Sequence, residues 1–143
     1  MVLTPADLGE LIADVWAPSV GLEVTLDGPA DEDAFAHAAS VAFLGDRDGA
    51  VCIDASEGFT RELAAVMFGL PPQDVTVADE RDALGEMANV IAGNVKSFTD
   101  GTVDLALPVS GPAAPRDGAP NPTAVVHARL GGAPVRVAVC LNG

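Results

Sequence analysis

Positive charge is scarce in this sequence, and the shortage excludes several classes of function. The 143 residues contain 7 Lys and Arg against 21 Asp and Glu, so the formal net charge is −14, and Lys96 is the only lysine. A chain this acidic repels phosphate backbones and anionic lipid headgroups. We therefore expect no nucleic-acid partner and no role at a membrane surface.

Cysteines and long apolar runs are also lacking. Cys52 and Cys140 are too few for a disulfide framework or a CxxC metal site, and both lie in apolar, strand-like runs, so we expect buried free thiols. The N-terminal residues lack the basic and apolar regions of a secretory signal. No apolar stretch approaches the roughly 20 residues of a membrane helix. These absences predict a cytoplasmic protein without a membrane anchor.

Apolar residues are plentiful. They make up 49% of the chain, which is typical of globular proteins. A length of 143 residues suits one domain that can bury a core without staples. We therefore predict a single domain over residues 1–143.

Periodicity and capping residues predict three helices and six strands. In chain order these are a helix from Pro5 that ends at Pro18 and Gly21, strands at 22–26, 35–44 and 49–54, a helix from Ser56 to near Gly69, a helix at 77–98, and strands at 103–107, 123–130 and 133–141. Residues 108–122 contain five prolines and two glycines and are expected to form a loop. Because strands come in runs instead of alternating with helices, the fold class is predicted as α+β with a mainly antiparallel sheet.

The helix predicted at 77–98 carries the most informative pattern. At about 100° per residue, Asp82, Glu86, Asn89 and Gly93 form one stripe along it, each three or four residues from the next. The opposite side is apolar and is predicted to face the core. Its residues are Leu84, Met87, Ala88, Ile91, Val95 and Phe98.

A polar stripe on an amphipathic helix is usually no more than a solvated surface. Here, however, the helix contains Asn and Gly, which are poor helix formers, and it lacks the common Glu/Lys lattice. Gly93 leaves a notch one turn beyond Asn89, where a partner surface can come close. The residues alone thus favour an interaction face that carries a carboxylate and an amide.

The same residues resemble a known family signature. Asp82, Glu86 and Asn89 are spaced D-x-x-x-E-x-x-N and are followed by 22 residues and then Pro112, a pattern similar to that of the CheC/CheX/FliY phosphatases. The string ALGEMANVIAGNVK at 83–96 resembles the CheX branch most closely. CheC-type members usually carry two E-x-x-N motifs. The other two predicted helices contain none, which favours a CheX-like reading.

The resemblance implies a fold with long helices packed on one face of the sheet, and a phosphatase that acts on the phospho-aspartate of CheY-like receiver domains. It implies that Asn89 orients the attacking water and that Glu86 pairs with the receiver's lysine, with Asp82 and Gly93 supporting the docking face. The receiver would supply Mg²⁺, so this chain is expected to bind no metal or cofactor itself. The resemblance also implies a homodimer, built across sheet edges.

Other functions are open at this stage. A non-catalytic adaptor of the same fold would recognise a receiver or a switch protein without hydrolysing the phosphoryl group. A purely structural homodimer would bind no receiver. His37 and His127 lie in strand-like runs and are interpreted as structural or surface histidines. No phosphate loop, zinc spacing or nucleophile elbow is present in the sequence.

Overall fold

The computed structural model describes residues 3–20, 23–25, 34–46, 48–98, 102–113, 122–130 and 132–141. These residues form three α-helices and seven strands, together with short 3-10 turns at Pro72–Asp74 and Lys96–Phe98. The elements in chain order are α1 (Pro5–Val20), β1 (Glu23–Thr25), β2 (His37–Gly45), β3 (Gly49–Ala55), α2 (Glu57–Phe68), α3 (Val77–Val95), β4 (Val103–Leu105), β5 (Val109–Pro112), β6 (Ala124–Leu130) and β7 (Ala133–Leu141).

The strands form one antiparallel sheet, which confirms the predicted α+β class. The strand order is β1-β6-β7-β3-β2-β4, and β5 also pairs with β2, so β4 and β5 share one edge. β2–β3 and β6–β7 are hairpins, as the sequence predicts. In the second hairpin, Gly132 has φ +85°, a conformation that glycine adopts without strain.

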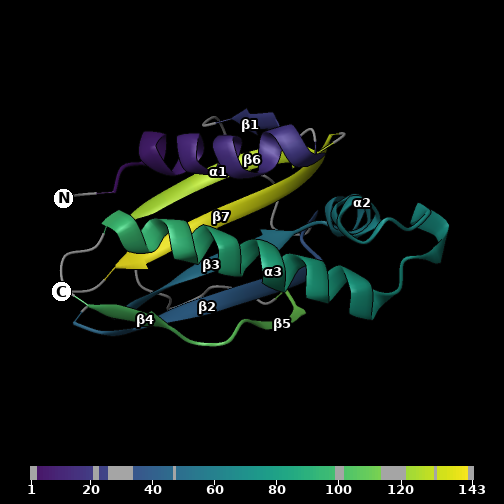
Figure 1. The fold of residues 1–143 in the computed structure, drawn as a ribbon. Helices are drawn as coiled ribbons and strands as arrows, with labels where there is room; N and C mark the ends of the chain where they lie inside the picture. The colour runs from purple at the N-terminus through teal and green to yellow at the C-terminus, as the bar shows by residue number, and fades with distance from the viewer. Residues whose placement is uncertain are drawn as a thin grey trace.

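The helices cover one face of the sheet (Figure 1). α1 and α3 lie across this face, and α2 lies at one end of the layer, packed against α3. Strand residues alternate between the core and the other face, as in β2, where Ala39, Val41 and Phe43 are buried. The core between the sheet and the helices is built mainly from Val, Ala, Leu and Ile.

α1 ends at Val20, directly before Gly21 as predicted, with Pro18 in its last turn. The predicted loop at 108–122 is wrong in part. Residues 109–112, assigned to a loop from their composition, form the strand β5. An edge strand tolerates glycine and proline because only one of its sides must pair. The rest of the predicted loop, 114–121, lies outside the described residues.

Neither cysteine forms a disulfide, as predicted, but both are only half-buried instead of buried. Val51 and Ile53, the neighbours of Cys52 in β3, are buried in the core. Since side chains alternate along a strand, Cys52 points to the face of the sheet opposite the helices. The apolar run around Cys52 therefore does not mean that both faces of β3 are buried. Among the described residues, no helix is both long and apolar enough to cross a membrane.

Candidate functional site

Helix α3 carries all four predicted site residues, and its start is fixed by a capping box. The Asp79 backbone N–H donates to Thr76 Oγ1 over 3.1 Å, and the Thr76 N–H donates to Asp79 Oδ2 over 3.0 Å. This reciprocal pair satisfies two donors that a helix start otherwise leaves without a partner. The phase of the helix is set by its apolar side. Leu84, Met87, Ala88, Ile91 and Val95 are fully buried, as predicted, whereas Phe98 is only partly buried.

The opposite side of α3 presents the predicted stripe to the surface. Asp82, Glu86 and Gly93 are exposed and Asn89 is partly exposed. Within the described part of the chain, the side chains of Asp82, Glu86 and Asn89 make no hydrogen bond or ion pair, so their polar atoms are available to a partner. The structure thus places the four residues on one side of one helix. Glu86 and Asn89 are adjacent along it, less than one turn apart.

Gly85 brings the stripe close to the edge of the sheet. A Cβ atom built on this buried glycine would lie 3.4 Å from Ser110 Oγ and 3.5 Å from Pro108 Cβ. The segment around β5 therefore packs directly against α3, beside Glu86. The sequence analysis missed this neighbour because it assigned residues 108–112 to a loop, and no local pattern shows which helix an edge strand will meet.

A buried polar contact ties α3 to two other elements. Glu80 is almost fully buried; its Oε1 accepts a hydrogen bond from Thr60 Oγ1 on α2 over 3.2 Å, and its Oε2 lies 3.6 Å from His37 Nε2 on β2. His37 thus has a structural position, in agreement with its interpretation. The sequence analysis did not single out Glu80, although it stands four residues before Leu84 and so on the apolar side of the helix.

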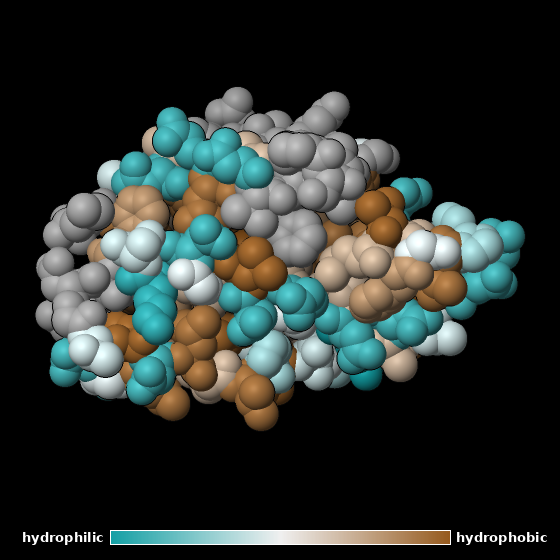
Figure 2. All heavy atoms as spheres, in the orientation of Figure 1, coloured by the Kyte–Doolittle hydropathy of each residue, from teal (hydrophilic) through white to brown (hydrophobic). Residues whose placement is uncertain are grey.

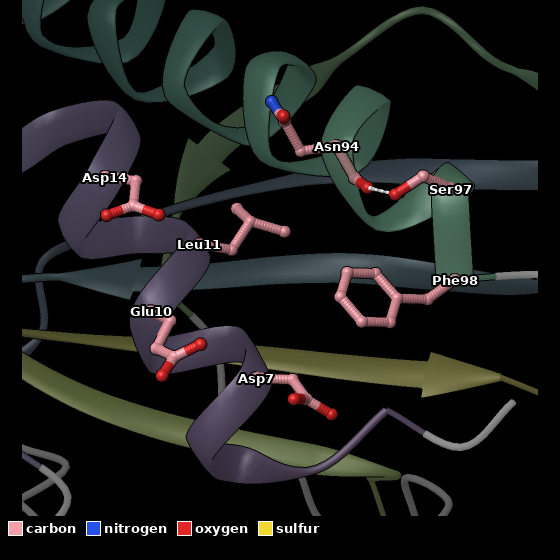
Figure 3. A pocket seen from close by; sticks show the side chains of 7 residues that line it. All are labelled: Asp7, Glu10, Leu11, Asp14, Asn94, Ser97 and Phe98. Carbon is pink, nitrogen blue, oxygen red and sulfur yellow. Dashed lines mark hydrogen bonds between the residues drawn. The ribbon is translucent and has the colours of Figure 1, made fainter.

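A groove lies between α1 and the end of α3 (Figure 3). This open groove of about 250 Å³ has partly buried Leu11 and Phe98 between the helices. Its polar lining consists of Asp7, Glu10, Asp14, Asn94 and Ser97. Three of these residues are acidic, but no group of three or more His, Cys, Asp or Glu side chains placed to hold a metal ion occurs in the described ranges. The groove contains none of the predicted site residues.

Comparison with known families identifies this arrangement. The family described as chemotaxis phosphatase CheX matches residues 37–110, about half of the chain, including all of α3. The chain belongs to the CheX family. This match confirms the resemblance drawn from the stripe and the string at 83–96. A search of curated proteins found no match.

Solved structures of CheX and related proteins share the fold. The chemotaxis protein CheX of Vibrio vulnificus is 18% identical, with a TM-score of 0.68 over 96% of this chain and 92% of that one. CheX of Borrelia burgdorferi, solved in a complex with CheY, BeF3 and Mg²⁺, is 14% identical, with a TM-score of 0.66 over 95% and 93%. FliY of Thermotoga maritima is 16% identical, with a TM-score of 0.59 over 98% and 92%.

Proposed function

We propose that this chain hydrolyses the phospho-aspartate of a CheY-like receiver domain, with Glu86 and Asn89 as the working pair. The observation that carries the proposal is the position of these two side chains on the surface of α3, without partners among the described residues and opposite the buried side. Membership of the CheX family supports it. So does the complex of a structurally similar CheX with CheY, BeF3 and Mg²⁺.

The proposed reaction needs a positioned water more than it needs an acid or a base. Water attacks the phosphorus, the bond between the phosphorus and the aspartate oxygen breaks, and inorganic phosphate leaves. The amide of Asn89 accepts a hydrogen bond from the water and donates one toward a phosphoryl oxygen, which holds the water in line with the breaking bond. Phosphoryl transfer depends largely on such positioning and on charge stabilisation.

Glu86 has a docking role in this proposal. Its carboxylate pairs with the lysine of the receiver site, which fixes the register of the two proteins. Asp82, one turn earlier, supports the same face, and Gly93 allows the partner to approach closely beyond Asn89. The receiver supplies the Mg²⁺ ion, and this chain contributes no metal or cofactor. By the resemblance to CheX, we also propose that the chain forms a homodimer across sheet edges, which sedimentation of the purified protein tests.

The decisive experiment measures the decay of a phosphorylated receiver domain from the same genome, with and without this protein. Asn89→Ala is expected to slow the accelerated decay about a hundredfold, the typical effect of losing one preorganised hydrogen-bonding group. Glu86→Ala is expected to weaken docking as well as turnover. Asn94→Ala is the matched control, because Asn94 is an exposed asparagine of the same helix that lines the groove toward α1 instead.

Two results contradict the proposal. Full activity in both Glu86→Ala and Asn89→Ala removes these residues from the mechanism. If the wild-type chain binds several receivers without accelerating their decay, the chain acts as an adaptor of the same fold and not as a phosphatase.

A further inference from the structure

A β-bulge interrupts the edge of the sheet beside α3. β4 pairs with β2 up to Leu105, which lies opposite Phe43. β5 resumes the pairing at Val109, which lies opposite Ser40. Three residues of the edge segment therefore oppose two residues of β2, which is the pattern of a bulge. Bulges at sheet edges redirect a side chain and are common next to active sites.

The bulge presents Leu107 to solvent in a fixed place. Of the large apolar side chains described, Leu107 has the highest exposed fraction, 86%. The chain is held on both sides of it, because the Ala106 N–H donates to the Ala42 carbonyl over 2.9 Å and Pro108 has a restricted backbone. An exposed leucine on such a fixed segment loses little conformational freedom when a partner covers it.

The position of the bulge relates it to the proposed site. Pro108 and Ser110 are the residues that a Cβ on Gly85 would contact, so the segment lies against α3 next to Glu86. Figure 2, viewed from the helix side, shows apolar side chains at the lower edge of the molecule, where Figure 1 places β4 and β5 below α3. The segment that carries Leu107 therefore borders α3 at Gly85, the residue before Glu86.

We infer that Leu107 is the apolar anchor by which this chain docks the receiver domain on which Glu86 and Asn89 act, an inference that rests on the proposed function. The occupant is the receiver face around its phosphorylated aspartate, with an apolar side chain that covers Leu107. A chain with a net charge of −14 has only 7 basic residues with which to make charged contacts to acidic groups of a partner. An uncharged contact supplies affinity without them.

Val109 provides a matched control on the same edge strand. Its exposed fraction is 68%. It lies opposite Ser40, whose neighbours Ala39 and Val41 point into the core, so Val109 projects from the face of the sheet opposite α3. Leu107→Ser and Val109→Ser thus each remove one exposed apolar side chain from the same segment, and that of Val109 lies on the face away from α3. Both residues are exposed, so both variants are expected to fold, and Leu107→Met restores an apolar anchor.

The test measures the dissociation constant for a receiver domain activated with beryllofluoride and Mg²⁺, and the decay rate of the phosphorylated receiver at saturating protein. Leu107→Ser is expected to raise the dissociation constant about tenfold, as fits the loss of one buried apolar anchor, with the saturated rate within about twofold of wild type. Val109→Ser and Leu107→Met should leave both quantities near wild type.

Several outcomes overturn the inference. An unchanged dissociation constant in Leu107→Ser does so, as does an equal loss in Leu107→Ser and Val109→Ser. A dimer that dissociates in Leu107→Ser, with unchanged receiver affinity, assigns the anchor to a second copy of the chain and also overturns it. If receiver binding depends on Leu107 but the decay is not faster, the docking inference holds and the proposed phosphatase activity is refuted. If the wild-type chain binds no receiver, both proposals are refuted.

Discussion

Replacing Gly93 with alanine is expected to stabilise the protein while weakening its action on a receiver. Glycine inside a helix costs about 0.8–1 kcal/mol relative to alanine, because it loses more backbone freedom on folding. A Cβ on Gly93 would meet nothing within 4 Å, so no clash offsets the gain. The free energy of unfolding should rise by about 0.8 kcal/mol. In a chain of this size that corresponds to about 3 °C in Tm.

The functional half of this prediction has the opposite sign. If the receiver approaches the notch at Gly93, the added methyl group occupies part of the space that the partner needs. The dissociation constant for the activated receiver should then rise severalfold. The measurements are urea unfolding followed by circular dichroism, and receiver binding, on the same protein preparations.

Two other glycines calibrate the stability measurement. In Gly85→Ala the new Cβ makes ordinary contacts at 3.4–3.5 Å with the β5 segment, so a similar gain is expected. Gly69 ends α2 with φ +65°, where a side chain is strained, so Gly69→Ala should lose about 1 kcal/mol. Failure of Gly93→Ala to stabilise the fold would refute the energetic reasoning. A stabilised variant with unchanged receiver affinity would show that the partner does not use the notch.

Two further predictions concern the buried polar contact and pH. Thr60→Val should lower the free energy of unfolding by about 2 kcal/mol in urea titrations, because it removes a buried hydrogen bond to the Glu80 carboxylate; Thr60→Ser keeps the hydroxyl and should lose less. Burial, and secondly the Arg136 guanidinium, lower the pKa of His127 below 6.5. The unfolded chain therefore binds this proton more readily, so stability should be complete above about pH 6.5 and decrease as the pH falls through the folded pKa. A His127→Gln variant whose urea midpoint shows the same decrease would assign the effect to other groups.

Much of the fold was predictable because its signals are local. The Ser56 side chain accepts from the Phe59 N–H at the start of α2, and Gly69 caps its end, as the sequence suggests. The core side of α3 followed from apolar spacing alone. What local pattern could not provide was the pairing of β5 with β2, since its register depends on residues far away in sequence and its own composition favours a loop. The packing of this segment on Gly85 was therefore also hidden.

The residues that most strongly predicted the site are those that are unfavourable in a helix. The structure shows that these residues have different surroundings. Gly85, Asn89, Gly93 and Asn94 all reduce the intrinsic stability of α3. Gly85 is buried against the β5 segment of this chain, where alanine would also fit. Asn94 donates its side-chain N–H to the Val90 carbonyl and lines the groove toward α1. Asn89 and Gly93 have neither kind of contact within the described residues. Their cost to the helix therefore has no explanation in the contacts of the described residues, and a partner that binds over them is the explanation that the receiver-decay and Gly93→Ala measurements test directly.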